Sequence, residues 1–172
     1  MKKLFVIANN RLELPDNDGN LKLPCAIGRS GMIDATKKRE GDGASPIGIW
    51  PLKRVYFRPD RLSAPATKLP ITPLAENMGW CDAPNDPNYN TRVTRPYPAS
   101  HEVLWREDHV YDIIVELAHN DDPPVPGLGS AIFMHIAKPD YSPTQGCAAL
   151  NLDDLLKVLA LSDTDTCLEF RA

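Results

Sequence analysis

The hydrophobic positions of this chain fall in short groups between polar turns, a pattern typical of β-strands. Some groups alternate apolar with polar residues, as strands with one buried face do. Residues 131–136 are nearly all apolar, which indicates a strand covered on both faces. We predict strands at residues 4–8, 11–14, 21–27, 47–52, 111–119, 131–136 and 166–171.

A polar stretch at residues 16–20 separates two of these strands and reads Asp-Asn-Asp-Gly-Asn. Asn, Asp and Gly tolerate the positive φ that tight turns need. We therefore predict a hairpin turn there.

One segment has the period of a helix. Its four leucines fall on one stripe, Asn151 precedes them as a favourable N-cap, and two aspartates occupy the first turn. We predict a helix at residues 152–161. The stripe consists of Leu152, Leu155, Leu156 and Leu159.

Proline marks one long region as irregular. Few apolar residues recur with a regular period between residues 58 and 100, where the chain is rich in proline. We expect a loop-rich insertion at residues 58–100, with a packed piece at residues 77–82, inside a single domain of residues 1–172.

The predicted fold is mainly β, of the β-rich α+β class. It is a mixed-sheet sandwich or barrel-like domain with one main helix and a long proline-rich loop.

The composition is that of a soluble globular protein, with 42% hydrophobic residues, 24% charged residues and a formal net charge of −4. Basic residues are scattered, so we expect no nucleic-acid partner. The apolar run near the N-terminus is too short for a signal-peptide core, and no segment is long enough to cross a membrane. We therefore expect no membrane span and recognise no signal peptide in this chain.

The cysteines are far apart and have no metal-ligand spacing, either to one another or to histidine. A domain of this size does not need disulfides. We expect free thiols, no metal site and no organic cofactor. The four residues are Cys25, Cys81, Cys147 and Cys167.

One pair of residues carries candidate chemistry. His135 ends an apolar strand, and Cys147 follows a polar loop and Gly146. A cysteine needs a nearby base or positive field to be a nucleophile at neutral pH, and an imidazole can supply it. A glycine beside the nucleophile lets backbone N–H groups of the turn stabilise an oxyanion. The alternative is that Cys147 is a small core residue and His135 a structural one.

Three motifs together resemble the L,D-transpeptidase (YkuD-type) family. The first motif is the family signature, a strand histidine followed by a Ser/Thr-x-Gly-Cys turn, which is similar to residues 132–135, Ile-Phe-Met-His, and residues 144–147, Thr-Gln-Gly-Cys. Residues 40–52 resemble its Thr-Pro-x-Gly-x-aromatic strand, and residues 151–155 resemble the start of its helix after the cysteine. The resemblance spans most of the chain and implies an L,D-transpeptidase catalytic domain of a compact subfamily.

The chain departs from the family pattern at the cysteine turn. Many members have His-Gly-Cys-x-Arg, whereas here Gln145 precedes Gly146 and Ala149 stands where the arginine would be. If that arginine holds a substrate carboxylate, Arg29 or Arg39 is the candidate to replace it. The candidate substrate-binding residues are Thr144, Gln145, Arg29, Arg39 and Trp80.

The resemblance implies an enzyme that acts on peptidoglycan, with Cys147, His135 and Gly146 as catalytic residues. Cys147 would form an acyl-enzyme with a stem peptide, a D-amino acid would leave, and an amine of a second stem peptide would take the acyl group. The alternatives are an L,D-carboxypeptidase or amidase, in which water is the acceptor, and a non-catalytic wall-binding module. The group that orients His135 stays open among a backbone carbonyl, Asp140 and Ser142.

The resemblance also implies a place in the periplasm or cell envelope. The partners would then be donor and acceptor stem peptides of peptidoglycan. We expect the protein to be a monomer.

Overall fold

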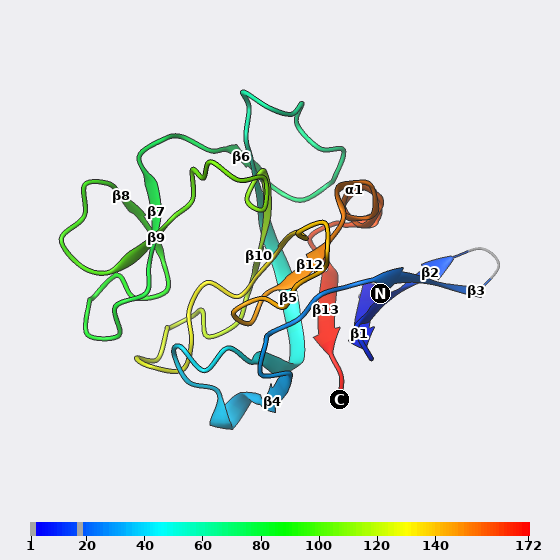
Figure 1. Ribbon diagram of the computed structural model, residues 1–172, viewed down its shortest axis with the longest axis horizontal. Coiled ribbons are helices and arrows are strands. Elements are labelled where there is room, and N and C mark those ends of the chain that lie inside the picture. Colours follow the sequence, from blue (N-terminus) through cyan, green and yellow to red (C-terminus); the bar gives the residue numbers. More distant parts are fainter. Residues whose placement is uncertain (1–2, 17–18) are drawn as a thin grey trace.

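The computed structural model describes residues 3–16 and 19–172, which form a mixed β-sheet, a small second sheet and one α-helix (Figure 1). The helix α1 spans Leu152–Leu161, and a short 3-10 helix spans Ala35–Lys37. The strands are β1 (Lys3–Ala8), β2 (Arg11–Asp16), β3 (Gly19–Pro24), β4 (Met32–Asp34), β5 (Ser45–Phe57), β6 (Ile71–Pro73), β7 (Met78–Cys81), β8 (Arg92–Thr94), β9 (His101–Val103), β10 (Ile113–Leu117), β11 (Phe133–Ile136), β12 (Ala148–Leu150) and β13 (Thr166–Phe170).

The main sheet follows the order β12-β11-β10-β5-β13-β1-β2-β3, with β4 and β6 also paired to β5. The β11–β12 and β1–β13 pairs are parallel, and the other pairs along this path are antiparallel. The chain that follows β3 then meets β12 at the opposite end of the path. The Ala26 N–H donates to the Ala149 carbonyl at 2.8 Å, and the Ala149 N–H donates back at 2.9 Å. These bonds bring the mixed sheet close to a closed barrel, as the mainly β prediction allows.

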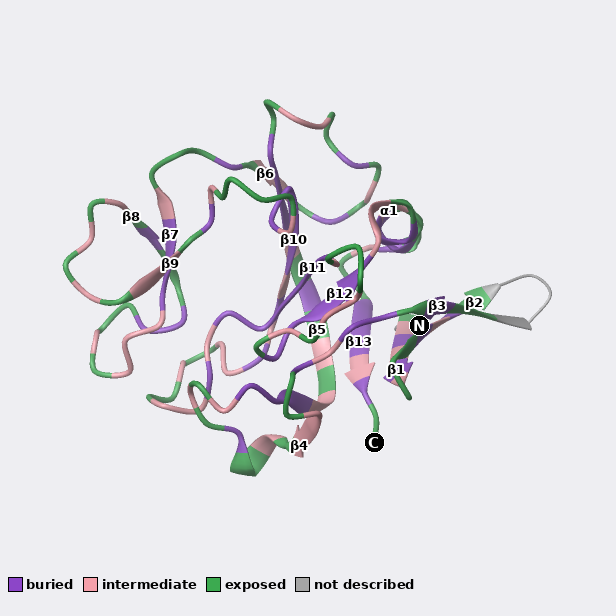
Figure 2. Cartoon of the chain, in the orientation of Figure 1, coloured by how far each residue is buried: buried purple, intermediate pink, exposed green. Residues whose placement is uncertain are grey.

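Both faces of β11 are buried, and successive side chains of this strand pack into different cores. Met134 and Ile136 belong to the larger core, whereas Phe133 belongs to a smaller core that also contains Cys147. Successive side chains of a strand point to opposite faces, so His135 lies on the same face as Phe133. The register of β11 therefore directs His135 to the side of the sheet where Cys147 packs. Figure 2 shows this central part of the sheet as largely buried.

The helix α1 closes the larger core on one side of the sheet, with Leu155, Val158 and Leu159 fully buried. Each such side chain stabilises the fold by roughly 1.5–3 kcal/mol. At its start the Asn151 side chain accepts a hydrogen bond from the Asp154 N–H at 2.9 Å. The predicted helix and its cap are therefore confirmed. None of the helices in residues 3–16 and 19–172 is long and apolar enough to cross a membrane.

The region at residues 58–100 contains β6, β7 and β8 between long irregular stretches. The predicted packed piece at residues 77–82 coincides with β7, which lies between β8 and β9 in an antiparallel three-stranded sheet. Figure 1 shows this small sheet to one side of the main one.

Each predicted strand corresponds to a strand of the structure, with different ends. The main difference is β5, which runs from Ser45 to Phe57, although only residues 47–52 were predicted. Pairing with β13 and β10 holds this strand extended through the polar positions Lys53 and Arg54. The predicted hairpin turn at residues 16–20 includes residues 17 and 18, which lie outside the described residues.

Candidate active site

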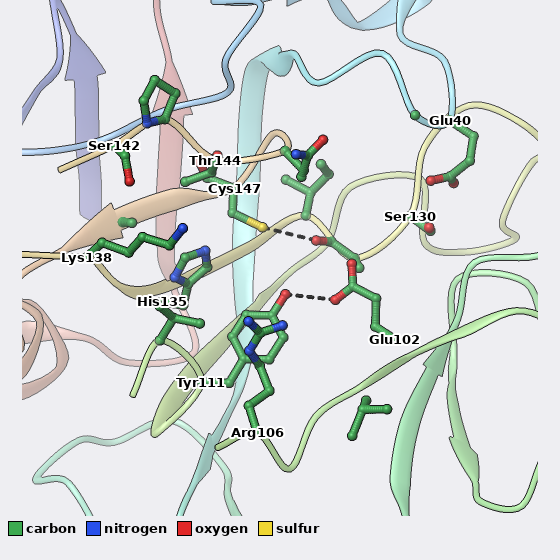
Figure 3. A pocket seen from close by; sticks show the side chains of 18 of the residues that line it. Glu40, Glu102, Arg106, Tyr111, Ser130, His135, Lys138, Ser142, Thr144 and Cys147 are labelled. Carbon is green, nitrogen blue, oxygen red and sulfur yellow. Dashed lines mark hydrogen bonds between the residues drawn. The ribbon is translucent and has the colours of Figure 1, made fainter. Parts of the chain in front are cut away.

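A cavity of about 570 Å³ brings together segments that are far apart in the sequence (Figure 3). Of the predicted site residues, His135, Thr144, Gln145 and Cys147 line it. His135 is 8% exposed and Cys147 is 6% exposed, so both lie in the cavity wall and largely out of bulk water. This burial controls the protonation of both groups.

The turn before Cys147 requires glycine at position 146. Gly146 has a φ of +136°, and a Cβ there would lie 2.8 Å from the Ala44 carbonyl oxygen. The Ser45 hydroxyl donates to the Gly146 carbonyl at 2.7 Å. The Thr144 hydroxyl accepts the Gly146 N–H at 3.0 Å and donates to the Cys147 carbonyl at 2.7 Å. Thr144 therefore braces the turn, and the Gly146 N–H, expected to serve an oxyanion, is held by Thr144 instead.

The sulfur of Cys147 is a thiol in this structure. It donates to the Ala131 carbonyl at 3.2 Å and accepts the Phe133 N–H at 3.4 Å. Burial raises the pKa of the thiol to about 12, and the nearby charge of Glu102 adds to this rise. A neutral thiol is therefore the resting form at pH 7.

The imidazole of His135 is oriented by a backbone carbonyl. Its Nδ1 lies 2.9 Å from the Ile136 oxygen, and a carbonyl can only accept, so Nδ1 carries the proton. The other ring nitrogen, Nε2, is then an acceptor. Burial lowers the pKa of His135 to about 4, which keeps the ring neutral at pH 7. Asp140, one of the alternatives considered, instead accepts the Ser142 N–H at 3.0 Å.

Cys147 and His135 line the same cavity, and Figure 3 shows their side chains next to each other in its wall. No hydrogen bond joins these two described side chains, because the thiol donates to Ala131. A rotation of the Cys147 side chain away from Ala131 is needed before the imidazole can accept the thiol proton.

Several cavity residues were not predicted from the sequence, among them Glu102, Arg106 and Tyr111. The Tyr111 hydroxyl donates to Glu102 at 2.7 Å, and the Tyr111 ring stands edge-on to the His135 ring at a centroid distance of 5.3 Å. The Arg106 guanidinium lies 5.2 Å from the centre of the Tyr111 ring and binds Asp108 through Nε at 2.8 Å. The only sequence signal for this group was the position of Tyr111 at the start of the strand predicted for residues 111–119.

The two arginines predicted to replace the missing family arginine do not line the cavity. Arg29 contacts the Gly41 carbonyl at 3.4 Å, and Arg39 donates to the Lys38 carbonyl at 2.7 Å, so both side chains hold the neighbouring loop. At the expected arginine position, Ala149 is buried in the cavity wall. The cations that do line the cavity are Lys38, Arg106 and Lys138.

Trp80 also lies outside the cavity lining, but it supports the cavity wall. Its indole N–H donates to the Asn90 side-chain oxygen at 2.9 Å, and the same oxygen accepts the Ala131 N–H at 3.0 Å. The Ala131 carbonyl in turn accepts a hydrogen bond from the Cys147 thiol. The insertion is therefore connected to the cysteine through a chain of hydrogen bonds.

All four cysteines are free and buried. Within the described part of the chain, no group of three or more His, Cys, Asp or Glu side chains has an arrangement that can hold a metal ion.

A nearly closed mixed sheet that places a cysteine and a neutral histidine in one cavity wall defines a β-rich domain with a candidate thiol nucleophile. Over residues 3–169 the chain matches the YkuD family, described as the L,D-transpeptidase catalytic domain. The protein therefore belongs to this family.

The chain is similar to several solved structures, of which two are L,D-transpeptidases from mycobacteria. L,D-transpeptidase 1 of Mycobacterium tuberculosis has 12% sequence identity and a TM-score of 0.42, over 97% of this chain. An L,D-transpeptidase from Mycobacterium smegmatis has 13% identity and a TM-score of 0.47, over 99% of this chain. The match covers 59% of each of those chains. No curated protein matches the sequence.

Proposed function

We propose that this protein is a peptidoglycan L,D-transpeptidase in which Cys147 is the nucleophile and His135 the general base. The observation that carries the proposal is the shared cavity wall, where the Ile136 carbonyl fixes the His135 tautomer so that Nε2 is an acceptor beside the thiol. Membership of the family supports peptidoglycan as the substrate. We also propose that the protein acts as a monomer in the periplasm or cell envelope.

The first half-reaction begins from a neutral thiol and a neutral imidazole. The Cys147 side chain turns away from Ala131, and its proton passes to Nε2 of His135 as the sulfur attacks the carbonyl carbon of the donor stem peptide. The Cys147 N–H has no backbone acceptor among the described residues and is our candidate to bind the developing oxyanion. The carbon–nitrogen bond then breaks, the imidazolium gives its proton to the leaving D-amino acid, and a thioester remains.

The second half-reaction transfers the acyl group to an amine of a second stem peptide. The amine nitrogen attacks the thioester carbonyl, a carbon–nitrogen bond forms, and the carbon–sulfur bond breaks with its electron pair going to sulfur. Protonation of the sulfur restores the thiol. Stem peptides carry carboxylates, and the Arg106 and Lys138 side chains in the cavity lining are the cations we propose to bind them.

The test is incubation of defined muropeptides with the wild-type protein and with the Cys147→Ala variant, followed by mass analysis of the products. Wild type is expected to form cross-linked dimers, and Cys147→Ala is expected to form none. Cys167→Ala is the matched control, because Cys167 is a buried cysteine in β13 that does not line the cavity. Dimers formed by Cys147→Ala would overturn the proposal. Trimmed monomers alone from wild type would identify a carboxypeptidase, and no product at all would favour a wall-binding module.

A further inference from the structure

Glu102 is a carboxylate in the cavity that the mechanism above does not use. It is half-buried and lies in the cavity lining. One of its oxygens accepts the Tyr111 hydroxyl at 2.7 Å, and no other hydrogen bond to this carboxylate is found among the described residues. None of the ion pairs among the described residues includes Glu102. One oxygen is therefore available to a cation that enters the cavity.

The position of Glu102 relative to the nucleophile is informative. Figure 3 shows Glu102 on one side of Cys147 and His135, with Lys138 and Ser142 on the other side. A substrate bound through its carboxylate at Lys138 leaves the Glu102 side of the cysteine open to a second substrate. Lys138 is a cation on one side and Glu102 a carboxylate on the other, which suits a substrate carboxylate at Lys138 and an ammonium group at Glu102.

The charged and titratable groups that face Glu102 come from several elements. They are Tyr111 before β10, Arg106 in the preceding loop, Asp82 after β7, Glu40 in the loop before β5, and Cys147 before β12. Burial raises the pKa of Glu102, and the charges of Asp82 and Glu40 add to this, against the opposing effects of Tyr111 and Arg106. Glu102 is therefore a stronger base than an exposed glutamate.

An acceptor amine needs such a base. A primary amine has an ordinary pKa of about 10.4, so at pH 7 it is almost entirely an ammonium ion with no lone pair to attack the thioester. His135, with its pKa lowered to about 4, is a poor acceptor for this proton. The remaining carboxylate in the lining, Glu40, already accepts the Tyr89 hydroxyl at 2.5 Å.

We propose that Glu102 binds the ammonium group of the acceptor and takes one proton from it in the second half-reaction. The proton moves from nitrogen to Oε1, the freed lone pair attacks the thioester carbon, and the carbon–sulfur bond breaks. A second proton from nitrogen passes to the sulfur through His135, so the product is a secondary amide. Glu102 then releases its proton to water. This inference rests on the proposed transpeptidase function and assigns its acceptor site.

The experiment compares wild type with Glu102→Gln and measures the two half-reactions separately. Intact-protein mass analysis gives the rate at which the donor acylates Cys147, and product analysis gives the ratio of cross-linked to hydrolysed product as the acceptor concentration is varied. For Glu102→Gln we expect acylation within about twofold of wild type, transfer to the amine reduced by about a hundredfold, and a higher acceptor KM. Raising the pH should recover part of the transfer, because more of the acceptor is then the free amine.

Glu107→Gln is the matched control, because Glu107 is an exposed glutamate of the same segment outside the cavity lining. It should behave as wild type. If Glu102→Gln does not fold, Glu102→Asp replaces it, with a smaller loss of transfer expected because the carboxylate is kept.

Equal loss of acylation and transfer would indicate a structural role and overturn the proposal, and so would unchanged transfer. Failure of wild type to acylate Cys147 would overturn the proposed function itself, which keeps the two results distinct.

Discussion

At the cysteine and histidine, burial determines the resting protonation. The thiol of Cys147 has a raised pKa and the imidazole of His135 has a lowered one, so the resting pair consists of two neutral groups. In the proposed mechanism, the thiolate nucleophile is formed only when the thiol proton moves to Nε2 during attack on the substrate. Such a site protects its sulfur from reaction with small electrophiles in the absence of substrate.

This protonation predicts the pH dependence of alkylation at Cys147. Reaction with iodoacetamide should be slow at pH 7 and should rise about tenfold per pH unit into the alkaline range, because the thiolate fraction follows a pKa of about 12. Mass analysis of the peptide that contains Cys147 gives the rate. The same cysteine in the urea-unfolded chain is the control, where an ordinary pKa of about 8.5 applies. A reaction rate that already levels off below pH 8 would show a thiolate at rest.

The sequence allowed a prediction of the pair but not of its surroundings. His135 and the Gly146–Cys147 turn are separated by one loop, so their relation was visible in a local motif. Glu102 reaches the cavity through the pairing of β9 with β7, which no local pattern encodes. Arg29 and Arg39 were expected in the cavity, but they contact backbone carbonyls of their own neighbourhood instead.

At the scale of elements, one buried asparagine joins the small sheet to the cavity wall. Besides accepting from Trp80 and Ala131, the Asn90 side chain donates to the carbonyls of His119 and Asn120 at 3.1 and 2.7 Å. Asn90 is 7% exposed, so water cannot readily replace these partners. The three-stranded sheet is therefore part of the support of Cys147.

We predict that Asn90→Ala lowers the free energy of unfolding by about 2–4 kcal/mol, because it leaves buried donors and acceptors unsatisfied. Urea unfolding measures the change. Asn88→Ala, at an exposed position of the same loop, should change it by less than about 1 kcal/mol. Equal effects of the two substitutions would contradict the supporting role of Asn90.

Elements differed in how far the sequence could predict them. The helix α1 was predictable with both its ends, because its leucine stripe and its Asn151 cap are local signals. The strands β7, β8 and β9 have three or four residues each, which is too short for a period to be recognised. They exist because they pair with one another, and this pairing is a property of the folded chain.

For the whole molecule, two histidines are buried and largely out of bulk water. His119 is 4% exposed and packs edge-on to Trp50 at a centroid distance of 4.8 Å, while His135 lies in the cavity wall. Burial lowers the pKa of each imidazole to about 4. Between pH 6.5 and 4 the unfolded chain therefore binds more protons than the folded chain.

The free energy of unfolding should consequently fall as the pH decreases from 6.5 to 4. The stabilisation that comes from the two neutral histidines should be complete above pH 6.5. Each histidine contributes on the order of 3 kcal/mol over this range, since one pKa unit corresponds to about 1.4 kcal/mol. Urea unfolding at a series of pH values measures the slope. His119→Phe should reduce the slope by about half, because only His135 remains. A stability that does not change between pH 6.5 and 4.5 would contradict the neutral state of both rings.

The central claim is that Cys147 carries the acyl group, and intact-protein mass spectrometry after mixing with a stem tetrapeptide tests it most directly. The claim predicts one adduct with the mass of the donor minus its leaving D-amino acid, located on Cys147 by peptide mapping and lost when an acceptor amine is added. Cross-linked product formed while Cys147 stays unmodified, or an adduct on another residue, would contradict it.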